Sequence, residues 1–167
     1  MLEKVISGCQ TGADIAGLKA AKLAGLDTGG FISAGFRTLD GKKPEYARTY
    51  GITELPTWQY PPRTEANVKN SDGTIRFASD WNSAGELLTM KLIKKHKKPS
   101  LSININELPE VEVVHAWLDK HNITVLNVAG NSEQTSPGIE QSVARYLYQV
   151  FQIYEPDESR QEQQMLF

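Results

Sequence analysis

The most constraining stretch of the sequence is residues 5–14, where two apolar residues precede small and polar ones and then the start of a helix. The order Val-Ile-Ser-Gly-Cys-Gln-Thr-Gly-Ala-Asp is typical of a buried strand, a tight turn and a helix N-terminus. Backbone N–H groups at such a helix start lack intrahelical acceptors and favour an anion. The stretch matches neither the Gly-x-Gly-x-x-Gly fingerprint nor a Walker loop. Two interpretations stay open: a phosphate-binding turn, or a tight turn whose glycines serve only steric needs.

The chain has 167 residues, of which 40% are apolar and 23% charged, and this composition is typical of a globular protein. We expect a single domain over residues 1–154 and a polar tail over 155–167. No apolar run approaches the roughly 18 residues of a membrane span. The first residues lack the pattern of a secretory signal, so we expect a cytoplasmic protein.

Cysteine and histidine usage argues against a metal site. The single cysteine, Cys9, excludes an internal disulfide and a cysteine-based zinc site, and His96, His115 and His121 show no local ligand pattern. The net charge of -2 argues against binding of nucleic acid, which usually needs a basic face. The one basic run, residues 94–98, closes a predicted helix, where cations complement the helix dipole.

Strand and helix patterns alternate along the chain, which predicts a three-layer α/β, Rossmann-like fold with a mainly parallel sheet of five strands or slightly more. Expected strands are 5–7, 26–32, 74–78, 100–105 and 123–128, and expected helices are 14–24, 64–70, 85–95, 109–118 and 138–154.

Residues 33–62 lack periodicity and are rich in glycine, proline and aromatic residues. A loop of this length is either functional or disordered, and its aromatic residues favour an ordered cover beside the site. Arg37 within it is a candidate contact for an anionic ligand, or a solvated loop charge. Thr64 is the expected cap of the helix that follows.

Right-handed crossovers place the turns 8–12, 79–85 and 130–136 at the same carboxyl edge of the sheet. Ligands of open α/β sheets bind at this edge, where the strand order reverses. This convergence is the main functional prediction from the pattern of the chain.

Three stretches carry a family resemblance: Ser-Gly-Cys-Gln-Thr-Gly-Ala-Asp at 7–14, Arg-Thr-Glu-Ala-Asn-Val-Lys-Asn-Ser-Asp-Gly-Thr at 63–74, and Leu-Asn-Val-Ala-Gly-Asn-Ser-Glu-Gln-Thr-Ser-Pro-Gly-Ile at 126–139. With them the chain resembles, over residues 3–153, the putative molybdenum carrier proteins, a branch of the SLOG superfamily of Rossmann-like nucleotide-binding domains. The resemblance implies a small anionic ligand, either molybdenum cofactor (molybdopterin) or a nucleotide.

The chain departs from that family pattern at three places. Cys9 stands where the family has glycine, Ala34 where it has lysine, and Ser83-Ala84-Gly85-Glu86 where it has Thr-Gly-Gly-Thr. The related LOG branch, which hydrolyses nucleoside monophosphates, carries a glutamate that would align with Thr89. Glu86 lies about one helical turn away from that position.

The leading hypothesis is a binding or carrier protein for an anionic phosphorylated heterocycle at the carboxyl edge of the sheet. The alternative is a hydrolase that acts on the N-glycosidic bond of a nucleotide-like substrate, with Asp14 or Glu86 as acid or base; for Asp14, helix capping competes with that role. We expect a homodimer, because the last helix and residues 165–167 offer apolar surface, although the same surface could equally belong to the core. The predicted ligand-binding residues are Gly8, Cys9, Gln10, Thr11, Gly12, Arg37, Arg63, Asn67, Ser83, Gly85, Gly130, Asn131 and Ser132.

Overall fold

The computed structural model describes residues 1–152 of the chain. The strands are β1 (Lys4–Ile6), β2 (Asp27–Ile32), β3 (Arg37–Thr38), β4 (Gly41–Lys42), β5 (Ile52–Glu54), β6 (Gly73–Ala78), β7 (Ser100–Asn104) and β8 (Val125–Gly130). The helices are α1 (Ala13–Leu23), α2 (Tyr46–Tyr50), α3 (Tyr60–Lys69), α4 (Ala84–His96), α5 (Val111–Lys120) and α6 (Ile139–Gln152).

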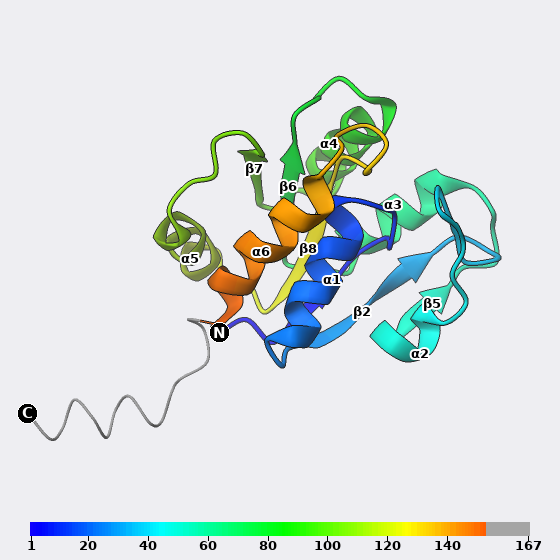
Figure 1. Cartoon of the computed structure of the whole chain (residues 1–167), viewed down its shortest axis with the longest axis horizontal. Coiled ribbons are helices and arrows are strands. Elements are labelled where there is room, and N and C mark those ends of the chain that lie inside the picture. Colours follow the sequence, from blue (N-terminus) through cyan, green and yellow to red (C-terminus); the bar gives the residue numbers. More distant parts are fainter. Residues whose placement is uncertain (153–167) are drawn as a thin grey trace, which may run out of the picture.

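Six of these strands form one sheet in the order β5-β2-β1-β8-β6-β7 (Figure 1). Every pair of neighbours in it is parallel. Strands β2 and β5 lie on one side of β1, and the later strands β6, β7 and β8 lie on its other side. The order therefore reverses next to β1. The predicted three-layer, Rossmann-like α/β fold is confirmed.

The two faces of the sheet differ in polarity. Helices α1, α5 and α6 cover one face, and Ile75, Phe77, Leu126 and Val128 from the strands belong to the main apolar core with them. Figure 1 shows α1 and α6 side by side across this face. Because side chains alternate along a strand, Thr74, Arg76 and Asn127 point to the other face, which α3 and α4 cover. All three of these polar residues are buried.

The segment 33–62 contains more regular structure than its composition predicts. It holds the hairpin of β3 and β4, helix α2, and β5, which pairs with β2 at one edge of the sheet. Strand β5 is too short to show a period in the sequence, and it is stabilised by pairing with β2 rather than by its own propensity. The segment is thus an ordered edge of the domain.

Helix α3 begins at Tyr60, before the predicted cap Thr64. The Thr64 hydroxyl donates to the backbone oxygen of Tyr60 at 3.3 Å, inside the first turn. Pro61 and Pro62 occupy the helix start, where a missing N–H is tolerated. The prediction that Thr64 caps this helix is therefore wrong. The other predicted bounds within residues 1–152 differ from the observed ones by at most two residues, and the predicted end of the last helix at 154 lies outside the described residues.

Within residues 1–152, no helix is long and apolar enough to cross a membrane. The predicted polar tail 155–167 and the apolar end 165–167 lie outside the described residues.

Gly130, at the end of β8, tests the close approach of this strand to β6. Gly130 has φ +147°, and a Cβ there would lie 1.9 Å from the backbone oxygen of Phe77. We predict that Gly130→Ala lowers the free energy of unfolding in urea by about 3 kcal/mol, because it adds both a clash and backbone strain.

Gly85 is the matched control, since a Cβ there meets nothing within 4 Å. Gly85→Ala is expected to change the free energy of unfolding by less than about 1 kcal/mol. Similar losses in the two variants would show that the close approach at Gly130 does not limit stability.

Candidate functional site

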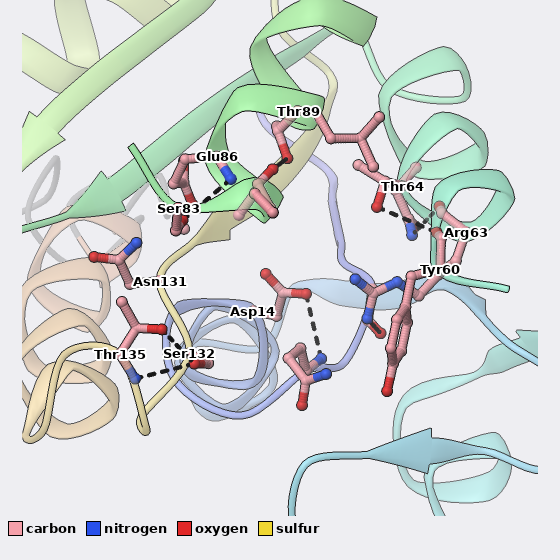
Figure 2. A pocket seen from close by; sticks show the side chains of 18 of the residues that line it. Asp14, Tyr60, Arg63, Thr64, Ser83, Glu86, Thr89, Asn131, Ser132 and Thr135 are labelled. Atoms are coloured by element: carbon pink, nitrogen blue, oxygen red, sulfur yellow. Dashed lines mark hydrogen bonds between the residues drawn. The ribbon is translucent and has the colours of Figure 1, made fainter. Parts of the chain in front are cut away.

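A cavity of about 460 Å³ opens at the carboxyl edge of the sheet, next to the point where the strand order reverses (Figure 2). Its walls come from the turn after β1, from α3, from the N-terminus of α4 and from the end of β8. The convergence predicted for turns 8–12, 79–85 and 130–136 is therefore confirmed. Of the predicted ligand-binding or catalytic residues, those that line the cavity are Gly8, Gln10, Asp14, Arg63, Asn67, Ser83, Gly85, Glu86, Gly130, Asn131 and Ser132.

Asn131 joins the three turns to one another. Its Oδ1 accepts from the backbone N–H groups of Ser79 and Asp80, both at 3.0 Å, and its Nδ2 donates to the backbone oxygen of Asp80 at 2.9 Å. Its own backbone oxygen accepts from Ala13 N at 3.1 Å. The Asn131 carboxamide is thus engaged by the protein, and its role in the cavity is to position the turns.

The turn after β1 does not present a row of unpaired amides. Cys9 N donates to Ser7 Oγ at 3.0 Å, Gln10 N to Asp14 Oδ2 at 3.2 Å, and Thr11 N to Gln10 Oε1 at 3.0 Å. The expectation of free N–H groups is wrong for these three residues, because nearby side chains already accept from them. These contacts favour the tight-turn interpretation of this stretch.

Gly12 has a steric role in the same turn. A Cβ at this residue would lie 2.3 Å from the backbone oxygen of Asn131. The glycine therefore lets the first turn approach the turn after β8.

Four predicted ligand contacts do not line the cavity: Cys9, Thr11, Gly12 and Arg37. Cys9 is 1% exposed and packs with the apolar cluster that includes Ile15 and Leu18. This burial raises the pKa of the thiol well above its usual value, so Cys9 stays protonated. Thr11 Oγ1 donates instead to Gln134 Oε1 at 2.6 Å, and Arg37 is exposed on β3.

Arg63 and Asp14 both lie beside Gly8 in the wall of the cavity. A Cβ at Gly8 would lie 3.0 Å from Asp14 Oδ2 and 3.1 Å from the Arg63 guanidinium carbon. Arg63 Nη1 donates to Gly8 O at 3.3 Å, and the guanidinium lies 5.0 Å from the centre of the Tyr60 ring. Its buried Nε has no partner among the described residues. Figure 2 shows the Asp14 carboxyl and the guanidinium turned toward each other.

Burial raises the pKa of Asp14 to about 6. The positive charge of Arg63 and the N–H of Gln10 oppose this shift but do not cancel it. Near neutral pH, Asp14 therefore carries a fraction of protonated carboxylic acid.

Glu86, the other candidate acid, is 3% exposed and forms a buried ion pair. Arg76 Nη1 donates to Glu86 Oε2 at 3.0 Å and to its backbone oxygen at 3.3 Å, and Arg76 Nη2 donates to Ser102 Oγ at 2.9 Å. Burial raises the pKa of Glu86 to about 7, and the Arg76 charge acts against that rise. The pair fixes the first turn of α4 to β6 and β7.

Helix α4 directs its N-terminus at the cavity. Ser83 caps it, because Ser83 Oγ accepts from Glu86 N at 3.4 Å. Within residues 1–152, the N–H groups of Ala84 and Gly85 have no hydrogen-bond acceptor. These two amides are the free helix-terminal donors of the site.

Comparisons with known proteins identify the family of this chain. The model of the circularly permutated YpsA SLOG family matches residues 5–151. The chain belongs to this SLOG family. A solved structure titled as a putative molybdenum carrier protein from Syntrophus aciditrophicus SB is similar, with 36% sequence identity, a TM-score of 0.82, and coverage of 90% of this chain and 94% of that one. No curated protein matches. The predicted family resemblance is confirmed.

In this SLOG chain, Thr89 stands at the position that aligns with the glutamate of the LOG branch. Its hydroxyl donates to Gly85 O at 2.9 Å. The carboxylate nearest in sequence, Glu86, is held by Arg76 instead. The sequence reasoning missed this partner, because Arg76 lies in an otherwise apolar strand. An ionisable residue in a buried strand is the signal that could have found it.

The roles of Asn67 and Asn127 differ from the sequence-based prediction. Asn67 lines the cavity, but Asn67 Oδ1 accepts from Phe31 N at 3.0 Å, and Nδ2 donates to the backbone oxygens of Phe31 and Arg63 at 3.0 and 2.9 Å. It therefore attaches α3 to β2. Asn127, which was not predicted, also lines the cavity and is 2% exposed.

The raised pKa of Asp14 predicts a pH-dependent stability. Between about pH 3.8 and 6 the unfolded chain loses this proton while the folded chain keeps it, so stability falls as the pH rises. Asp14→Asn cannot lose a proton. We predict that its stability relative to the wild type increases by on the order of 1–3 kcal/mol from pH 3.5 to 7, measured by urea unfolding.

Asp27→Asn is the matched control, because Asp27 is exposed at the start of β2. Its stability is expected to follow the wild-type pH profile. A constant difference between Asp14→Asn and the wild type across this pH range would contradict the prediction.

Proposed function

We propose that this SLOG domain binds an anionic, phosphorylated heterocycle, either of the molybdenum-cofactor type or a nucleotide derivative, in the cavity at the carboxyl edge. The family and the structural neighbour support a molybdenum carrier-like protein. The volume of about 460 Å³ lies within the usual range of small-molecule sites.

The anionic group of the ligand binds between Arg63 and the start of α4. Arg63 supplies a charge and a free Nε donor, and Ala84 and Gly85 supply backbone N–H groups at the positive end of a helix. Arg76 offsets the charge of Glu86, so this carboxyl does not exclude an anion. The unpaired Nε of Arg63 is the observation that carries the proposal.

The heterocycle packs against the apolar part of the wall. Leu39, Tyr60 and Leu88 line the cavity, and Leu39 and Tyr60 are exposed large apolar residues. Leu39 is held beside the first turn, because its N–H donates to Gln10 Oε1 at 2.8 Å. A planar ring in this position covers apolar surface that solvent otherwise contacts.

The polar groups of the cavity suit a cofactor that is bound through its phosphate and ring system rather than through a metal ion. Among residues 1–152, no group of three or more His, Cys, Asp or Glu side chains could hold a metal ion. The thiol of Cys9 lies outside the cavity wall. A molybdenum-bearing pterin would therefore bind through its phosphate and its ring system, by Arg63 and the start of α4.

A thermal-shift series tests the binding proposal. We expect nucleoside monophosphates, ADP-ribose or molybdenum cofactor to raise the melting temperature of the wild type. Arg63→Gln is expected to weaken the apparent affinity by at least about tenfold, because it removes a charge-assisted contact to the anion.

Arg145→Gln is the control, since Arg145 is an exposed arginine on α6. It is expected to keep the wild-type affinity. The proposal fails if none of the ligands stabilises the wild type, or if the two variants lose affinity equally.

A hydrolase acting on the N-glycosidic bond is the second candidate, and the environment of Asp14 favours it. A carboxyl with a pKa of about 6 at the cavity wall can protonate a departing base near neutral pH. The unprotonated fraction can instead orient a water molecule.

Base release from nucleoside monophosphates, followed by chromatography, tests this activity. If it occurs, Asp14→Asn should lower kcat by at least about 100-fold while the ligand-induced thermal shift remains. Glu86→Gln should have a smaller effect, because Arg76 holds that carboxyl. No base release by the wild type would leave Asp14 with its structural role, as acceptor for Gln10 N.

A further inference from the structure

Asn127 is the polar residue of β8 that lies beneath α3 and α4. Its neighbours Leu126 and Val128 point into the apolar core on the opposite face of the sheet. Asn127 itself is 2% exposed and lines the cavity. It lies three residues before Gly130, the last residue of β8, and therefore at the inner part of the cavity wall.

The hydrogen bonds of Asn127 are incomplete. Its Nδ2 donates to Thr74 Oγ1 at 3.2 Å, but its Oδ1 has no partner among the described residues. By contrast, Asn67 and Asn131, which line the same cavity, have both side-chain polar atoms hydrogen-bonded. A buried acceptor without a partner is unfavourable, so native proteins rarely leave one.

Two residues of the same cavity wall thus carry buried, unpaired side-chain atoms of opposite polarity. Arg63 Nε is a donor without an acceptor, and Asn127 Oδ1 is an acceptor without a donor. A ligand with an anionic group and a heterocyclic N–H satisfies both. This complementarity distinguishes ring systems that carry an exocyclic amino group from otherwise similar rings without one.

We infer that Asn127 Oδ1 accepts a hydrogen bond from an exocyclic amino group of the bound heterocycle, and that this contact selects amino-bearing rings over otherwise identical rings without the amino group. This inference rests on the proposed binding function and adds the class of ring. The oxygen is nearly enclosed, so the contact requires a small rearrangement of neighbouring side chains.

Matched nucleotide pairs test the inference in calorimetric titrations. Adenosine monophosphate is compared with purine riboside monophosphate, and guanosine monophosphate with inosine monophosphate; the second member of each pair lacks one amino group. We expect the wild type to prefer the amino-bearing member of at least one pair by about tenfold, since its absence leaves a buried acceptor unpaired.

Two variants separate ligand recognition from support of the fold. Asn127→Leu removes the acceptor at similar size, and is expected to abolish the preference while the amino-free nucleotide binds as before. Thr74→Val removes the partner of Nδ2 but keeps Oδ1. It is expected to retain the preference, and thermal melting shows whether each variant is folded.

The outcomes distinguish the inference from the function on which it rests. Equal binding within both pairs, with affinity still dependent on Arg63, overturns the role of Asn127 and leaves the binding function intact. Loss of the preference in Thr74→Val as well as in Asn127→Leu also overturns it, because a structural role then explains both. If none of the nucleotides, ADP-ribose and molybdenum cofactor stabilises the wild type, the binding function fails and the inference fails with it.

Discussion

The geometry of the site depends on one residue, Asn131. Its backbone and side chain bind to the start of α1, to the last residues of β6 and to the loop that leads into α4. These hydrogen bonds hold together turns that lie far apart in the chain, with 52 residues between Ser79 and Asn131 and a longer separation between Ala13 and Asn131. They are buried, and a buried amide network is stable only when its members are satisfied. The protein itself therefore holds the backbone of these turns in place.

Charge in the cavity is distributed unevenly. Arg76 donates hydrogen bonds to Glu86 and Ser102, and its guanidinium carbon lies 4.9 Å from the centre of the Trp81 ring. Arg76 therefore helps to position α4. Arg63 makes one hydrogen bond, to Gly8 O, and its Nε is unpaired. Arg76 also has an unpaired Nε, but of the two arginines only Arg63 lines the cavity. This difference is why the anionic part of a ligand is assigned to the α3 side of the site.

The sequence predicted the fold and the location of the site better than its chemistry. Alternating strand and helix patterns are local, so the α/β architecture and the shared edge of the three turns followed from them. Strand β5 was missed because three residues carry no readable period. The first turn was expected to offer free amides, but Ser7, Gln10 and Asp14 accept from them. Such pairings depend on side-chain orientation, which residue spacing does not encode.

The contrast between the two faces of the sheet has a consequence for how such domains diversify. The face under α1, α5 and α6 carries the apolar core, whereas the face under α3 and α4 carries Thr74, Arg76 and Asn127. Asn127 lines the cavity and Thr74 and Arg76 lie on the same face, so a substitution on this face can alter the ligand contacts of the cavity without removing a side chain from the apolar core. Within a fixed scaffold, related chains can therefore exchange one recognised compound for another by a few changes on a single side of the sheet.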